Sequence, residues 1–98
     1  MDIRKEWNDS VLTVYLAGKL DTNTAPQTEK ELEPDITAAR QLVLDIGKVQ
    51  YVSSAGLRLI LKLHKGMKEK EGMTVRNVNE SVTEVFDLTG FSDIMHIE

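Results

Sequence analysis

The stretch Gln41–Leu61, "QLVLDIGKVQYVSSAGLRLIL", decides the fold, because its hydrophobic pattern changes within a few residues. Its first part, Gln41–Ile46, is a nearly unbroken apolar run, which is typical of a central strand buried on both faces. Further on, leucines and an isoleucine recur at helical spacing and predict a helix from Ala55 to about Glu71. The polar segment Gly47–Ser54 is therefore predicted to be a loop between a strand and a long helix.

The residues nearer the start of the chain predict a β-hairpin. The segments "IRKEW" and "VLTVYLAG" flank the polar trio Asn8-Asp9-Ser10, whose side chains favour a turn between two strands. Apolar residues fall on both faces of the second segment, so we expect that strand also to be covered on both sides.

A first helix is predicted after the polar connector "GKLDTNT". It should begin near Ala25, with Thr24 as its cap and Gln27 completing a capping box. Because Pro34 cannot donate a backbone hydrogen bond, this helix is expected to end or kink around Glu33.

The last third of the chain predicts three further elements. "MTVRNV" is expected to be a strand, "SVTEVFDLTG" a short helix with a capping box from Ser81 and Glu84, and "DIMHI" a short final strand. The predicted order is ββαβαβαβ. Alternation of strands and helices after a hairpin indicates an α/β fold, with a mixed sheet and about three to four helices packed against it.

Composition limits the possible functions. The 98 residues, 41% of them hydrophobic, suffice for one compact domain, which we place at residues 1–98. A net charge of −4 disfavours nucleic acid and anionic membranes as partners, so a protein partner is expected. The chain has no cysteine, and we find no signal peptide and no apolar stretch of about 20 residues, the length that spans a membrane. We therefore expect a cytoplasmic protein that is a monomer when free.

The chain lacks the patterns of known catalytic and cofactor sites. A hydrolase elbow needs glycine two residues before its serine, but Val52 precedes Ser54 at that spacing. His64 lies about 15 Å further along the predicted helix, too far to activate the Ser54 hydroxyl. Neither a phosphate-binding glycine loop nor a metal-ligand cluster is present. We accordingly predict no enzyme activity, catalytic residue, cofactor or metal.

Ser53 and Ser54 lie where the long helix is expected to start. A serine is a preferred N-cap, which explains one of the two. Its neighbour would stand at the positive end of the helix dipole, where free backbone N–H groups favour a phosphate. A capping role and a phosphorylation switch are both open on these grounds.

Three segments, in order along nearly the whole chain, resemble the small bacterial anti-sigma factor antagonists built on the STAS domain. "GKLDTNTA" is similar to that family's G-x-L-D-x-x-[TS]-A, and "LVLDIGKVQYVSSAGLRLIL" to its hydrophobic strand followed by [DS]-S-[SAT]-G-L. "VFDLTGFSDIMHI" is similar to its closing F-x-[LM]-[ST]-G-[LF] helix and strand.

The resemblance implies partner switching. In the family, the unphosphorylated antagonist binds an anti-sigma factor that is also a serine kinase, and the sigma factor is released. Phosphorylation of one serine inactivates the antagonist, and a PP2C-type phosphatase restores it. The acceptor position corresponds to Ser54, while Ser53 stands where many members have aspartate. The partner-binding residues implied in this sequence are Asp21, Thr22, Asn23, Ser53, Ser54, Gly56, Leu57 and Arg58.

A second function is compatible with the same resemblance. Some STAS domains are structural subunits of bacterial ABC-type lipid-transport complexes, where they dock on a protein without a phosphorylation switch. In that case Ser54 would serve only as a helix cap and a contact residue.

Overall fold

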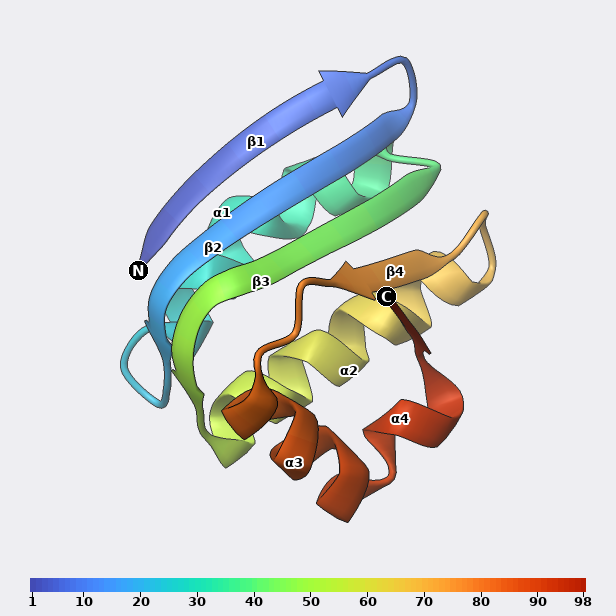
Figure 1. The fold of residues 1–98 in the computed structure, drawn as a ribbon. Helices are drawn as coiled ribbons and strands as arrows, with labels where there is room; N and C mark the ends of the chain where they lie inside the picture. Colours follow the sequence, from blue (N-terminus) through green and yellow to red (C-terminus); the bar gives the residue numbers. More distant parts are fainter.

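The computed structural model describes all 98 residues and contains one five-stranded sheet and four helices (Figure 1). The elements are β1 (Asp2–Asn8), β2 (Val11–Leu20), α1 (Ala25–Ala38), β3 (Gln41–Val52), α2 (Ser54–Lys68), β4 (Met73–Arg76), α3 (Glu80–Thr89), α4 (Phe91–Ile94) and β5 (His96–Ile97). Strands β1 and β2 are antiparallel, and every other neighbouring pair is parallel. The predicted α/β fold with an opening hairpin and a mixed sheet is therefore confirmed.

The strand β3 is twice as long as its apolar run suggested. It continues through Gly47–Val52, which we predicted to be a loop, and pairs with β2 as far as Leu20 opposite Val52. Register shifts after Tyr15 and after Gly18 accommodate this second half. The polar side chains misled the prediction because only Val49 and Val52 are buried in this part of the strand, and the other four residues are exposed.

Helix α1 continues through Pro34 to Ala38, so it does not end around Glu33. Proline removes only one hydrogen bond, and the last turn gains other partners. The ammonium group of Lys70 donates to the carbonyl groups of Ile36, Thr37 and Ala39, at 2.8–2.9 Å. Lys70 is distant in sequence from these carbonyl groups, so the sequence of α1 alone does not predict where the helix ends.

The predicted N-cap position of α1 is confirmed, but its capping bond and the predicted cap of α3 are not. The Thr24 hydroxyl makes no capping bond to α1: it donates to the Lys19 carbonyl at 2.7 Å and accepts from the Asp21 N–H at 2.9 Å. Helix α3 is capped by Asn79, whose Oδ1 accepts from the Val82 N–H at 2.9 Å. Its Nδ2 donates to the Val49 carbonyl at 2.7 Å, so a contact with β3 fixes the residue that caps α3.

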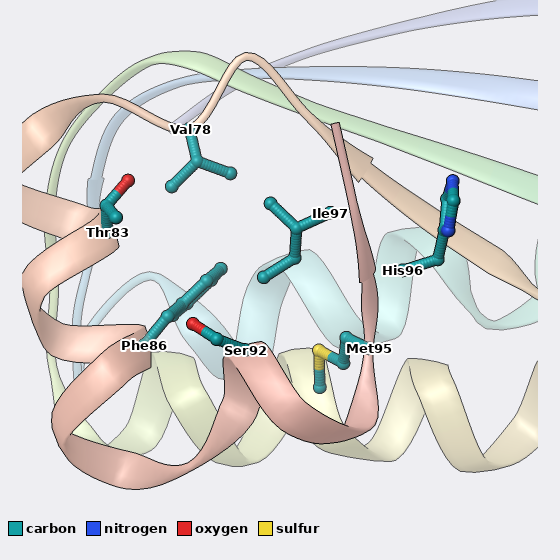
Figure 2. A pocket seen from close by; sticks show the side chains of 7 residues that line it. All are labelled: Val78, Thr83, Phe86, Ser92, Met95, His96 and Ile97. Atoms are coloured by element: carbon teal, nitrogen blue, oxygen red, sulfur yellow. The ribbon is translucent and has the colours of Figure 1, made fainter.

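The C-terminal part contains a short helix where we expected strand. Gly90, in a left-handed conformation with φ 80°, ends α3, and α4 follows directly, so that Ile94 is helical. Only His96–Ile97 joins the sheet, as β5 beside β4. A pocket of about 350 Å³ lies between α3, α4 and β5, with side chains such as Phe86 around it (Figure 2).

The helices α1 and α2 lie behind the sheet in Figure 1, and the core fills the space between. Alternate residues of β2 point to it and are buried, whereas the other side chains of β2 are only half-buried. The expectation that β2 and β3 are covered on both faces is therefore wrong. These strands look apolar on both sides because Thr, Val and Tyr also suit an open sheet face.

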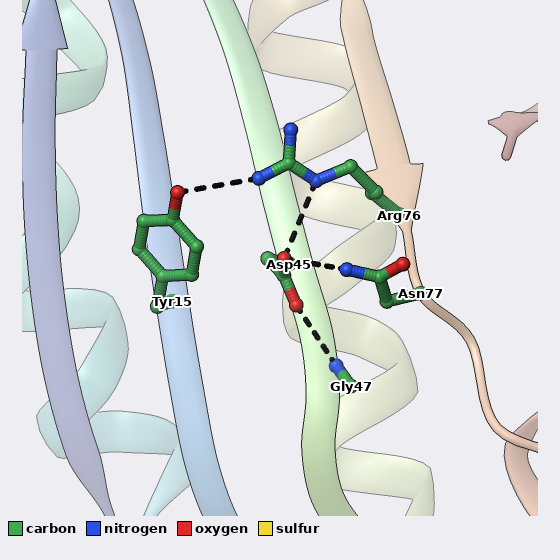
Figure 3. Close-up of polar contacts among 5 residues, drawn as sticks. All are labelled: Tyr15, Asp45, Gly47, Arg76 and Asn77. Carbon is green, nitrogen blue, oxygen red and sulfur yellow. Dashed lines mark hydrogen bonds and ion pairs between the residues drawn. The ribbon is translucent and has the colours of Figure 1, made fainter.

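A polar network takes the place of a second helical layer on the open face (Figure 3). Asp45 accepts hydrogen bonds from the Gly47 N–H at 3.0 Å, the Asn77 amide at 2.8 Å and the Arg76 guanidinium at 3.3 Å. Arg76 also donates to the hydroxyl of Tyr15 at 3.3 Å. The network thus links side chains of β2, β3 and the end of β4.

Candidate functional site

The carboxyl ends of β2 and β3 meet at one edge of the sheet. Leu20 is paired with Val52, and the Ser53 N–H donates to the Leu20 carbonyl at 2.9 Å. Because the two strands are parallel, the loop after Leu20 and the start of α2 emerge side by side. The sheet topology therefore brings Asp21 and Ser54, distant in sequence, to the same end of the molecule.

The first serine of this junction is the helix cap. Ser53 has an extended backbone, and its hydroxyl oxygen accepts a hydrogen bond from the Gly56 N–H at 3.3 Å. Its carbonyl accepts from the Leu57 N–H at 2.8 Å, which closes the first turn of α2. Ser53 is half-buried, and its side chain is committed to the helix start.

The second serine has no such role. Ser54 is the first residue of α2, is exposed to solvent, and its hydroxyl makes no hydrogen bond within the chain. It stands at the end of the helix where unpaired backbone N–H groups and the dipole favour a negative charge. The structure therefore separates the two serines that the sequence pattern left equivalent: Ser53 caps, and Ser54 is free.

Gly56 allows α2 to approach the end of β2. A Cβ atom on this buried residue would lie 2.6 Å from the Leu20 carbonyl oxygen and 3.0 Å from Cγ1 of Val52. No other residue fits without moving the backbone of β2 or α2. The glycine of the predicted partner-binding set therefore acts through packing, and its neighbour Leu57 is half-buried against the core.

The loop that faces this junction is ordered by Asp21. Its Oδ1 atom accepts from the Asn23 N–H at 2.9 Å and the Thr24 N–H at 3.0 Å, and its N–H donates to the Thr24 hydroxyl at 2.9 Å. Thr22 and Asn23 are exposed at the tip. The bonds that organise the loop thus leave its outer side chains at the surface.

The same hydrogen bonds keep Asp21 ionised. The Thr24 N–H is the main cause that lowers the pKa of Asp21 below its ordinary value, with a smaller contribution from the Asn23 N–H. Since the folded pKa is the lower one, this contribution to stability is complete above the ordinary pKa of aspartate. It is lost as the pH falls through the folded pKa. A negative charge therefore stands in the loop after Leu20, at the same end of the molecule as Ser54, at neutral pH.

A groove continues from this junction between α1 and α2. Its volume is about 280 Å³, and Arg58, an exposed member of the predicted set, lies on its wall. The remaining lining residues are Ala25, Pro26, Glu29, Ala55, Leu59 and Lys62. None of these six residues was predicted as part of a site, because only the packing of two helices brings them together.

Tyr51 was also missed. It precedes Ser54 by three residues and is 54% exposed at the end of β3. A large aromatic residue in a segment predicted to be a surface loop was the available signal. It adds an exposed aromatic side chain to the end of the strand that leads into α2.

His64 lies on α2, ten residues after Ser54, and no group of three or more acidic or histidine side chains is placed to hold a metal ion. None of the four helices combines the length and the apolar character that a membrane span needs.

Comparison with known proteins identifies the family. The family model of the STAS domain matches residues 2–98. The chain belongs to the STAS domain family. BtrV of Bordetella bronchiseptica, which carries the name of an anti-sigma factor antagonist, is 34% identical over 91 residues, covering 91% of this chain and 78% of BtrV. The anti-sigma-B factor antagonist of Bacillus subtilis is 30% identical over 98 residues, covering 99% of this chain and 88% of that protein.

A solved structure supports the fold. The crystal structure of an anti-sigma factor antagonist from Mycobacterium paratuberculosis superposes with a TM-score of 0.89 at 23% identity. The match covers 98% of this chain and 83% of that one. The resemblance in three sequence segments therefore extends to the whole arrangement of strands and helices.

Proposed function

We propose that this STAS protein is an anti-sigma factor antagonist that is switched off by phosphorylation of Ser54. The unphosphorylated form binds an anti-sigma factor that is also a serine kinase, and the sigma factor is released. A PP2C-type phosphatase removes the phosphate and restores binding. The names of BtrV and the Bacillus subtilis relative support the antagonist role, and the cytoplasm, where sigma factors act, is the expected location.

The proposal rests on the different roles of the two serine hydroxyl groups. Ser53 already caps α2 through its hydroxyl, so the exposed hydroxyl of Ser54 is not needed by the fold. A phosphate of about −1.5 to −2 charges can therefore be added to Ser54 without loss of a structural hydrogen bond. The docking surface changes its charge while the fold persists.

The binding surface in this proposal is the end of the molecule around Ser54. It combines the exposed tip of the Asp21 loop with the first two turns of α2. Thr22, Asn23 and Arg58 offer polar contacts, and Tyr51 an aromatic one. Gly56 contributes only by letting the loop and the helix come together.

Phosphorylation of serine-to-alanine variants tests the proposal. The purified chain is incubated with Mg-ATP and the serine kinase encoded nearest to its gene, and the modified residue is located by mass spectrometry. We expect phosphate on Ser54 in the native chain and in Ser53→Ala, and none in Ser54→Ala. Label retained in Ser54→Ala would contradict the assignment. A native chain that stays unlabelled while it docks on a lipid-transport complex would favour the non-switching subunit.

Stability measurements on the same variants provide the control. Ser53→Ala removes the cap of α2, so we expect the free energy of unfolding in urea to fall by about 0.5–2 kcal/mol. Ser54→Ala removes no hydrogen bond and should stay within about 0.5 kcal/mol of the native chain. The reverse order would show that Ser54 is the structural serine.

A further inference from the structure

The groove between α1 and α2 contains one uncompensated charge. Three charged side chains line it, and two of them, Glu29 and Lys62, form an ion pair at 2.5 Å. The third, Arg58, is exposed and makes neither an ion pair nor a hydrogen bond within the chain. In a protein with a net charge of −4, a free guanidinium next to the candidate acceptor serine is a distinctive local feature.

Arg58 lies within reach of Ser54. The two residues are four positions apart on α2, so their side chains stand on the same face of the helix with Cβ atoms about 5–6 Å apart. The guanidinium group presents parallel N–H donors that match two oxygens of a phosphate. A phosphate on Ser54 can therefore bond to Arg58 without any change in the backbone.

A negative charge lies at the same end of the molecule. The loop after Leu20 carries the ionised carboxylate of Asp21, and this loop starts next to α2, since the Leu20 carbonyl accepts a hydrogen bond from the Ser53 N–H. Like charges disfavour each other, whereas Arg58 attracts the dianion. Arg58 therefore directs the phosphate towards the groove.

We propose that Arg58 is the residue through which phosphorylation of Ser54 acts: free Arg58 binds a carboxylate on an acidic partner surface, and the phosphate captures it. The inference rests on the proposed function and adds the chemistry of the partner and the route of its release. In the phosphorylated chain the partner loses its cationic contact and meets a dianion instead. Phosphorylation thus removes the cationic contact and adds negative charge to the docking surface in one step.

A titration of the phosphorylated chain tests the capture without any partner. Phosphoserine is incorporated at position 54 of the full chain, and the phosphate is followed by ³¹P NMR as the pH is varied. A nearby cation stabilises the dianion, so the phosphate pKa should be lower in the native chain than in Arg58→Gln. The control is the double variant Glu29→Gln/Lys62→Gln, which removes a neutral pair and should behave like the native chain. Equal phosphate pKa values in the native chain and Arg58→Gln would overturn the proposal.

Binding measurements test the consequence for the partner. The probe is the anti-sigma kinase that labels Ser54, used without ATP. If Arg58 carries the switch, phosphorylation should weaken binding of the native chain by about tenfold or more, and of Arg58→Gln by less than about threefold. Unmodified Arg58→Gln should itself bind less tightly than the native chain.

The outcomes separate the two proposals. An equal effect of phosphorylation on the native chain and on Arg58→Gln would overturn the role of Arg58 and leave the switch at Ser54 intact. No effect of phosphorylation on the native chain would contradict the proposed function. The NMR titration would then still report whether Arg58 holds the phosphate.

Discussion

Two adjacent serines at the start of α2 differ in what their hydroxyl groups can do. Ser53 has an extended backbone outside the helix and bonds to Gly56, whereas Ser54 is already helical and points to solvent. A difference of one position at the helix start therefore separates a serine whose hydroxyl caps the helix from a serine whose hydroxyl is free. The candidate switch depends on that step, because a phosphate on the cap itself would break the first turn.

At Gly56, the addition of a single carbon atom is expected to change the stability of the fold. We expect Gly56→Ala to lower the free energy of unfolding by about 1–3 kcal/mol, because its Cβ would meet the Leu20 carbonyl oxygen at 2.6 Å. Urea denaturation monitored by circular dichroism measures the effect. The strain would also separate the Asp21 loop from Ser54.

Gly66 provides a matched control on the same helix. A Cβ there would meet only Cγ2 of Ile36, at the ordinary contact distance of 3.8 Å. Because alanine is the better helix former, Gly66→Ala should be neutral or stabilise the chain by up to about 1 kcal/mol. A similar loss in both variants would show that the close approach at Gly56 is unimportant.

At the scale of elements, the ends of helices are decided by neighbours that lie elsewhere in the chain. Asn79 caps α3 while it holds Val49 of β3, and Lys70 terminates α1 from beyond the end of α2. A cationic side chain at the carbonyl end of a helix satisfies free acceptors and opposes the helix dipole. This explains why α1 survives an internal proline.

Removal of the Lys70 ammonium group tests that explanation. Lys70→Met keeps the aliphatic length but loses three hydrogen bonds to carbonyl groups of α1 and its C-cap residue, so we expect a loss of about 1 kcal/mol in the free energy of unfolding. Lys30→Met, on the exposed side of α1, removes the same charge from a residue without such bonds and should have little effect. Amide hydrogen exchange should increase in the last turn of α1 only for Lys70→Met.

At the scale of the whole molecule, the open face of the sheet is joined by a single row of side chains. Arg4, Tyr15, Asp45 and Arg76 are register partners across β1, β2, β3 and β4. The Arg4 guanidinium lies 4.2 Å from the centre of the Tyr15 ring, and Asp45 and Arg76 form an ion pair at 3.3 Å. The row ties four strands together on the face that α1 and α2 do not cover.

Asp45 is the centre of this row. Asp45→Ala would leave the N–H of Gly47 and the side chains of Arg76 and Asn77 without their acceptor, at a cost of about 2 kcal/mol in the free energy of unfolding. Glu6→Ala, on the exposed strand β1, serves as the control and should stay within about 0.5 kcal/mol. Equal stability of Asp45→Ala and the native chain would show that the open face needs no such support.

Sequence patterns predicted most of the architecture and only part of the candidate site. Turn-forming residues located the hairpin, an unbroken apolar run located the strand that begins at Gln41, and helical spacing located the helix that follows Ser53, because these signals are local in sequence. The resemblance to the STAS family supplied Asp21 and Ser54 as site residues. The groove beside Arg58 was missed, since it exists only where two helices pack.

The sequence by itself determined the α/β class, the order of most elements and the presence of two serines at a helix start. Only the tertiary structure decided which serine caps the helix, how far β3 and α1 extend, and which face of the sheet stays open. The physical reason is the range of the interactions involved: hydrophobic periodicity is local in sequence. The contacts of Leu20 with Ser53, and of Lys70 with α1, form only when distant segments fold against each other.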